Sequence, residues 1–222
     1  RLREAELKAK NIEQEKEIEK QKIRNRIAQD LHDEIGSNLS SISLMSELIQ
    51  KDENTNPDTS EKLKRIHKVA KGSTQSIRDI VWLTNPSSDS LRDLVAKMKE
   101  VADNSLGKFN LSFDYPKDLP DINLLPETKR NIFFIYKEAL NNIVKHAEAK
   151  RVEIRFEIEP QTIFLSIRDD GKGFSTTGSS SGNGLKNIRS RAKEINANLK
   201  FESRPGSGTI LELSANITQT RD

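Results

Sequence analysis

The chain has 222 residues, and its 37 lysines and arginines against 34 aspartates and glutamates leave a formal charge of only +3. This length allows one or two domains, each with a buried core. Because the sequence contains no cysteine, a disulfide scaffold, a thiolate zinc site and a cysteine nucleophile are excluded. Acidic and basic residues are interleaved along the chain, so we expect no direct nucleic-acid partner.

The sequence contains no apolar run close to the roughly 18 residues that a membrane span requires, and no secretory signal opens it. It begins at Arg1, without an initiator methionine and inside a charged helical pattern. We therefore expect a cytoplasmic piece of a longer protein. Contact with the inner membrane is expected only through a missing upstream segment.

The first part of the chain is predicted to be helical. In residues 1–23, mainly apolar positions recur in steps of three and four, which predicts a short signalling coiled coil weakened by Lys16 and Glu19. After Ile23 the apolar pattern changes phase and continues to Ile49, so one helix is expected to carry both patterns.

Residues 52–59 form a turn cluster around Pro57, and Ser60 is a candidate N-cap of a second helix that ends at Asn85-Pro86. Residues 24–85 are thus expected to form an antiparallel helical hairpin. A hairpin cannot bury its apolar face alone, so two copies are expected to form a four-helix bundle in a homodimer. His67 follows the predicted seam residue Ile66 and is expected to face water.

Residues 87–216 mix helices and strands. All eleven aromatic residues lie at or after Trp82, which marks the change of character. We predict helices at 90–105, 127–147 and 185–196, and strands at 111–115, 151–158, 162–168, 198–203 and 209–214. This order favours a two-layer α/β sandwich with helices on one face of a sheet. The whole chain is therefore predicted to be multidomain, with an α-helical part and an α+β part.

His32 and Asp33 are the first candidates for chemistry. His32 lies about 100° around the helix from Leu31, toward solvent, with the acidic Asp33 beside it. Gly36, one turn further on, leaves a bare surface next to the imidazole. The pattern fits either an ordinary solvated histidine or a residue that a partner approaches.

A second polar face lies on the helix predicted for 127–147. Glu138, Asn142 and either Lys145 or His146 share this face. A carboxylate, an amide oxygen and nearby cations suit a hydrated Mg²⁺ with attached phosphates. Ordinary solvated side chains are the alternative.

Two glycine motifs follow. Asp169-x-Gly171-x-Gly173 ends an apolar strand, where the backbone must either turn sharply or let a ligand approach closely. Gly182-x-Gly184 precedes a helix whose N-terminal N–H groups can hold phosphate. Each motif is weak alone, but their order along the chain is informative.

With these motifs the sequence resembles the bacterial two-component sensor histidine kinases. DLHDEIG at 30–36 resembles their phosphoacceptor box, ExxxNxxKHA at 138–147 their N box, and the two glycine motifs their glycine boxes. The run VWLTNP at 81–86 resembles the subfamily that pairs with NarL-type response regulators.

The resemblance implies that His32 takes the γ-phosphoryl group of ATP and passes it to an aspartate of a response regulator. Asp33 would hold the imidazole tautomer and accept positive charge, and Glu138 stands where related ATPases keep a base for water. It also implies a Bergerat-type ATP-binding domain. The implied adenine residues are Asp169, Gly171, Gly173 and Thr209. The implied Mg²⁺ and phosphate residues are Asn142 (metal), Lys145, His146, Gly182 and Gly184. The alternative is a dimeric ATP-gated interaction module without histidine phosphorylation.

Position 37 departs from the resemblance. Many members of the subfamily continue from the aspartate as DxxxQ, with a glutamine that orients water for dephosphorylation of the regulator, whereas this chain has Ser37. Misplacing that water can cost about 100-fold in rate, so we predict kinase activity with weak or absent phosphatase activity.

The test measures how fast purified phospho-regulator loses its phosphate. It is mixed with the wild-type chain, with the Ser37→Gln variant or with neither. Strong dephosphorylation by the wild type, with no gain in Ser37→Gln, would contradict it.

Overall fold

The computed structural model describes Arg3, Ile18, Ile35 and residues 37–50, 56–175 and 183–217. The chain divides into two compact units, Arg1–Ser88 and Asp89–Asp222, and each is described by itself. The predicted coiled coil of residues 1–23, apart from Arg3 and Ile18, lies outside the described residues. Within the described part of the chain, no helix has the length and apolar character needed to cross a membrane.

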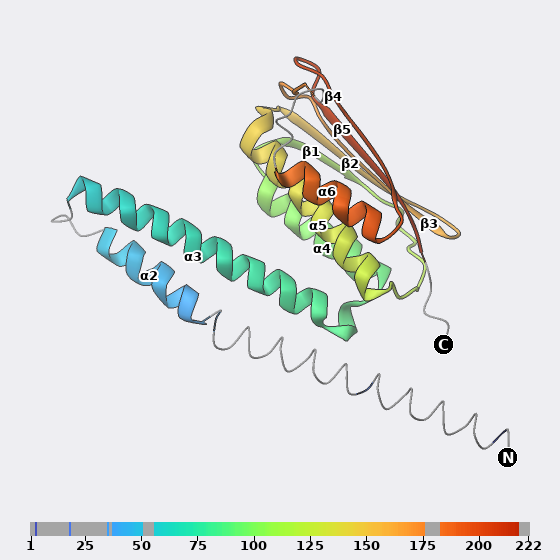
Figure 1. Cartoon of the computed structure of the whole chain (residues 1–222), viewed down its shortest axis with the longest axis horizontal. Helices are drawn as coiled ribbons and strands as arrows, with labels where there is room; N and C mark the ends of the chain where they lie inside the picture. Colours follow the sequence, from blue (N-terminus) through green and yellow to red (C-terminus); the bar gives the residue numbers. More distant parts are fainter. Residues whose placement is uncertain are drawn as a thin grey trace. The chain divides into compact units, whose positions relative to one another are not determined.

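The first unit contains a helical hairpin of α2 (Ser37–Gln50) and α3 (Pro57–Thr84) (Figure 1). The predicted N-cap at Ser60 is wrong, because the N-cap of α3 is Asn56, four residues earlier. The Asn56 side chain caps the helix by accepting a hydrogen bond from the Asp58 N–H at 3.0 Å. Pro57 is therefore the first helical residue, a position where its missing N–H costs nothing.

The predicted exposure of His67 is also wrong. The ring is half-buried, and its Nδ1 lies 3.0 Å from Ser43 Oγ and 3.1 Å from the Ser43 carbonyl oxygen. Nδ1 donates to the carbonyl oxygen in the tautomer that carries its proton there, and accepts from the Ser43 hydroxyl in the other. His67 therefore contributes a polar contact between α2 and α3.

The hairpin leaves much of its predicted apolar seam uncovered. Seam residues on both helices are between 39% and 63% exposed in the single chain, namely Ile42, Met45, Ile49, Ile66 and Ile80. Val69, outside the predicted seam, is 62% exposed as well. The helical hairpin is thus confirmed, whereas the bundle of two copies is not part of this single-chain structure.

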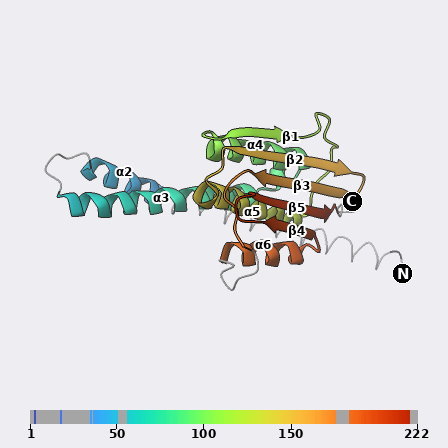
Figure 2. The ribbon, with the colours of Figure 1, turned by 90° about the horizontal axis from the view of Figure 1, so that it is seen from above.

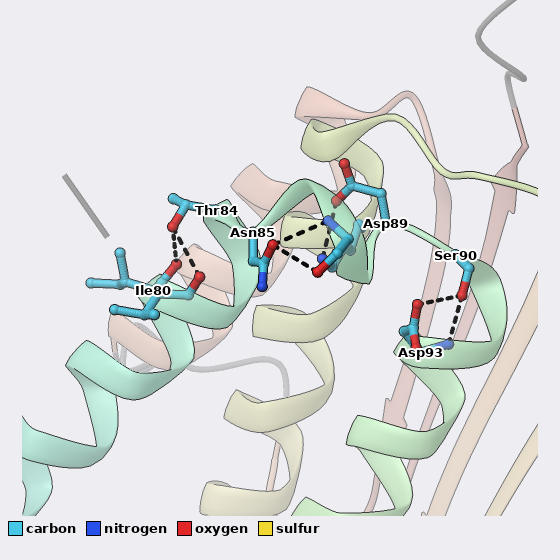
Figure 3. A network of polar contacts seen from close by, with 9 residues as sticks. Ile80, Thr84, Asn85, Asp89, Ser90 and Asp93 are labelled. Atoms are coloured by element: carbon cyan, nitrogen blue, oxygen red, sulfur yellow. Dashed lines mark hydrogen bonds and ion pairs between the residues drawn. The ribbon is translucent and has the colours of Figure 1, made fainter. Parts of the chain in front are cut away.

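Polar side chains end α3 (Figure 3). Thr84 Oγ1 donates back to the carbonyl oxygens of Ile80 and Val81, each at 3.0 Å. Asn85 Oδ1 accepts hydrogen bonds from the N–H of Ser87 at 3.1 Å and from its hydroxyl at 2.9 Å. These contacts support a short 3₁₀ helix, η2 (Pro86–Ser88), and the predicted end of the helix at Asn85-Pro86 is confirmed.

The second unit is a two-layer α/β sandwich, as predicted. Its sheet has the order β1-β2-β3-β5-β4, with β1 parallel to β2 and the other pairs antiparallel. The strands are β1 (Asn110–Asp114), β2 (Arg151–Glu159), β3 (Thr162–Asp169), β4 (Asn198–Ser203) and β5 (Thr209–Asn216). Helices α4 (Leu91–Leu106), α5 (Pro126–Asn142) and α6 (Asn183–Glu194) lie on one side of the sheet (Figures 1 and 2).

The core of this unit lies between the sheet and the helices. Alternate strand residues point inward, as the period of two requires, and those almost completely buried are Val152, Ile154, Phe156, Ile163, Leu165, Ile167, Leu211 and Leu213. The helices contribute Leu94, Met98, Ile132, Phe133 and Tyr136. Each such side chain contributes about 1.5–3 kcal/mol, so the strands that carry the candidate site stand on a rigid support.

A buried ion pair holds the first residues of the second unit. Lys129 on α5 is 0% exposed, and its Nζ lies 3.1 Å from Asp89 Oδ1. The Asp89 carbonyl oxygen accepts a hydrogen bond from the Leu124 N–H at 2.9 Å, and the Leu91 N–H donates to Ile122 O at 2.9 Å. The chain entering α4 is therefore fixed to the segment that leads into α5.

We predict that Asp89→Ala destabilises the second unit by about 3 kcal/mol, because it removes the carboxylate that compensates a buried ammonium. Denaturant unfolding of the chain measures this change. Asp103→Ala is the control, because its ion pair with Lys99 is half exposed and should be worth less than about 1 kcal/mol. Equal effects of the two variants would contradict the prediction.

Candidate nucleotide site

A cavity of about 610 Å³ lies in the second unit, between α5, the ends of β3 and β4, the start of β5 and the start of α6. Eight of the sequence-predicted residues line it: Glu138, Asn142, Lys145, His146, Asp169, Gly173, Gly184 and Thr209. Gly171 lies beside it, in contact with Asp169. His32, Asp33 and Gly182 lie outside the described residues. Motifs far apart in the sequence therefore surround one space.

The helix predicted for 127–147 changes form within the site. α5 ends at Asn142, and residues Ile143–Ala147 form a π-helical turn, η3, before Glu148 adopts a left-handed conformation with φ of 55°. Such turns have i→i+5 hydrogen bonds and are wider than an α-turn. The predicted single α-helix is therefore wrong over these last five residues. Lys145 and His146 both belong to the wider turn, and both line the cavity.

Asp169 is the buried carboxylate of the cavity. It ends β3 opposite Thr209 of β5, and only 4% of the residue is exposed. Oδ1 accepts a hydrogen bond from the Gly171 N–H at 2.9 Å. Burial raises the pKa of Asp169, and hydrogen bonds from Gly171 and Thr209 partly oppose this rise. A buried acceptor with a perturbed pKa in a cavity is typical of a functional residue.

The neighbouring Asp170 has a different role. Its Oδ1 accepts hydrogen bonds from the N–H groups of Lys150 at 2.7 Å and Arg151 at 2.8 Å. These two hydrogen bonds lower the pKa of Asp170, and the bond from Arg151 has the larger effect. Asp170 therefore fixes the start of β2, and it is not among the residues that line the cavity.

The glycines of the first motif are required by the protein's own backbone. A Cβ on Gly171 would lie 2.3 Å from the carbonyl oxygen of Ala147, the last residue of η3. Gly173 has φ of +57°, and its Cβ would lie 2.1 Å from the carbonyl oxygen of Arg204. The sequence left two reasons for these glycines, a sharp backbone turn or the close approach of a ligand. The structure directly supports the first, because at both positions the neighbouring backbone leaves no room for a Cβ.

Gly184 differs, because its closest neighbours are side chains. A Cβ there would lie 2.3 Å from Glu138 Oε1 and 3.6 Å from Asn142 Oδ1. The first turn of α6 therefore lies directly over the two oxygen-bearing side chains of α5.

Sequence reasoning missed several residues of the site. The rings of Phe174 and Phe201 line the cavity with their centroids 5.8 Å apart. Ser203, almost completely buried, hydrogen-bonds the Phe174 N–H and lies 3.1 Å from Thr209 Oγ1. The sequence did contain a signal for Ser203. This serine lies on the same face of β4 as Leu199 and Phe201, at a position where an apolar residue is expected.

The described residues contain no group of three or more histidines, aspartates and glutamates that could hold a metal ion. A carboxylate and an amide oxygen, from Glu138 and Asn142, do meet at the start of α6. Oxygen ligands of this kind fit Mg²⁺, which typically keeps several waters and takes only one or two protein ligands beside phosphate oxygens.

Comparisons with known proteins match both parts of the chain. Residues 24–89 match a family described as histidine kinase, and residues 128–219 match the histidine kinase-, DNA gyrase B- and HSP90-like ATPases. The sensor protein VraS of Staphylococcus epidermidis is 26% identical over 204 residues, covering 88% of this chain and 56% of the relative. VraS of Staphylococcus aureus has the same identity and coverage. The chain thus spans little more than half the length of these relatives.

Two solved structures share the fold. The histidine kinase domain of the Erythrobacter litoralis EL346 blue-light activated kinase has a TM-score of 0.52 at 14% identity, covering 82% of this chain and 94% of that one. Acinetobacter baumannii histidine kinase AdeS has a TM-score of 0.51 at 15% identity, covering 84% and 96%. The two family matches lie in the order that the sequence motifs predict, and the chain belongs to the two-component sensor histidine kinases, with a C-terminal domain of the ATP-binding type.

Proposed function

We propose that this chain binds Mg²⁺ and ATP in the cavity, transfers the γ-phosphoryl group to His32 and passes it to an aspartate of a response regulator. Residues 24–85 would carry phosphotransfer and residues 87–216 ATP binding. The observation that carries the proposal is the convergence of the N-box residues, Asp169 and the start of α6 on one cavity. The family relationship supports the same activity.

Asp169 is proposed to recognise the adenine base. The cavity walls near it include Ile167 and Leu211, which provide apolar surface for a flat ring. An ionised, buried carboxylate accepts a hydrogen bond from an exocyclic amino group but would oppose a carbonyl oxygen at the same place. This difference favours adenine over guanine.

The phosphates are proposed to lie near the junction of η3 and α6. Asn142 would ligate Mg²⁺, with Glu138 beside it, while Lys145 and His146 face the same space. The N-terminus of a helix attracts anions, and α6 begins at the cavity. Mg²⁺ would supply neutralisation of phosphate charge, and the chain's own residues would hold the nucleotide in place.

The phosphoryl step is proposed to use His32 as the nucleophile. A neutral imidazole nitrogen forms the N–P bond while the bond from the γ-phosphorus to the bridging oxygen breaks and ADP leaves. The second ring nitrogen carries a proton, and Asp33 would stabilise the resulting positive charge. The response-regulator aspartate then takes the phosphoryl group.

The uncovered seam of the hairpin supports a homodimer. Ile42, Met45 and Ile49 on α2, with Ile66 and Ile80 on α3, are exposed in one chain. These residues are regularly spaced along the two helices, as in the core of a helix bundle. We propose that a second copy covers them and completes a four-helix bundle.

We predict that His32→Gln abolishes incorporation of the ATP γ-phosphate while ATP affinity stays unchanged. The phosphate label should be acid-labile and base-stable in the wild type, and autoradiography after acid and base treatment measures it. His67→Gln is the control, because the His67 ring contacts Ser43 within the hairpin. This variant should still incorporate the phosphate label. A wild-type chain that binds ATP but never becomes labelled would favour the ATP-gated interaction module.

A graded series of glycine variants tests the cavity. Gly171→Ala should weaken ATP binding at least 100-fold, because its Cβ would meet the Ala147 backbone at 2.3 Å and displace η3. Gly184→Ala should cost at most about 10-fold, because the atom it meets is the end of the Glu138 side chain, which can change rotamer. Equilibrium titration with ATP measures both. Equal losses, or a larger loss for Gly184→Ala, would contradict this account of the site.

A further inference from the structure

Helix α6, whose first turn lies at the cavity, has few apolar contacts to hold it in place. Of its residues, Asn183–Glu194, only Ile188 and Ala192 are buried. Near its C-terminal end Glu194 lies 3.9 Å from Arg130 of α5, but both side chains are nearly half exposed, and a pair of this kind contributes little. The position of α6 on α5 therefore needs a more specific contact.

Arg191 makes two such contacts with α5. Its Nη1 donates a hydrogen bond to Asn131 Oδ1 at 3.3 Å, and its guanidinium carbon lies 4.5 Å from the centre of the Phe134 ring, a cation–π contact. Asn131 is 0% exposed, and within the described part of the chain its Nδ2 is buried without a hydrogen-bond partner. Residues three apart lie on one face of a helix, so one guanidinium holds α6 at two neighbouring points of α5.

The two helices run antiparallel, so this anchor and the cavity lie at different ends of α6 (Figure 1). Gly184, in the first turn, lies directly beside Glu138 and Asn142. Arg191 comes two turns later, roughly 10 Å along the helix axis. A helix this short moves as one body, so a change at the anchor shifts the first turn relative to Glu138 and Asn142.

We propose that Arg191 is a positioning residue for the phosphate end of the nucleotide site, acting through α6. This inference rests on the proposed function, because it takes the start of α6 as the place where phosphates bind. Arg191 does not line the cavity and is not proposed to touch the nucleotide. Apparent affinity falls with the fraction of molecules in the binding arrangement. A loosened α6 should therefore weaken the binding of phosphates and leave the adenine end, which is built on the strands, unchanged.

The test compares Mg·ATP with adenosine, which has the same base and ribose but no phosphate. For Arg191→Ala we expect ATP affinity to fall about 3- to 10-fold, the effect of losing a cation–π contact and a hydrogen bond, with adenosine affinity unchanged within about 2-fold. Arg189→Ala is the matched control, because Arg189 is exposed on the same helix and its loss changes the charge equally. The control should bind both ligands like the wild type, and equilibrium titrations measure all of these affinities.

A second variant removes the other side of the contact. Phe134→Leu keeps an apolar side chain but loses the ring face, so it should also lower ATP affinity, and adding it to Arg191→Ala should cause no further loss. Wild-type ATP affinity in either single variant, additive losses in the double variant, equal losses of ATP and adenosine in Arg191→Ala, or the same loss of ATP affinity in Arg189→Ala would each overturn the inference. A wild-type chain that binds adenosine as tightly as Mg·ATP would instead overturn the placement of phosphates at the start of α6, and with it this inference.

Discussion

The cavity depends on the close approach of the loop after β3 to the end of η3. The Lys172 N–H donates to the Ala147 carbonyl oxygen at 2.7 Å, and the Lys172 carbonyl oxygen accepts from the Gly206 N–H at 2.7 Å. Only a residue without a Cβ fits at Gly171, directly beside Ala147. These two backbone hydrogen bonds bring the turn that carries Lys145 and His146 to the strand ends that carry Asp169 and Thr209.

This packing also explains why two adjacent aspartates differ. Asp169 points into the enclosed cavity, where burial raises its pKa, while Asp170 accepts two backbone hydrogen bonds at the start of β2, and these lower its pKa. A carboxylate satisfied by its own backbone has little left for a ligand, whereas a buried carboxylate with open lone pairs favours any donor that reaches it. One position is therefore structural, and its neighbour is available for recognition.

Local pattern predicted most elements, because period and turn chemistry are properties of short segments. The strands of the second unit end within a few residues of their predicted limits. The π-turn at Ile143–Ala147 was missed, because no short-range signal marked the change from an α-turn to a wider one. The sequence pattern places Pro57 in a turn, whereas it is the first residue of α3, because proline fits the first helical position as well as a turn. The order of the motifs predicted which residues share the cavity, but Ser203 was missed because its partners lie on other strands and loops.

The two units differ in what completes them. The second unit buries its apolar strand and helix residues within one chain, so its cavity needs no other subunit for its shape. Among the described residues, α2 and α3 leave eight large apolar side chains, including Met45 and Val69, more than a third exposed, and such a surface is stabilised by association. Under the proposed function, nucleotide binding is then a property of one chain, whereas the helical pair that follows the phosphoacceptor box becomes stable with the dimer. In the proposed dimer, the stability of this helical pair should therefore depend on protein concentration, as it does in obligate homodimers.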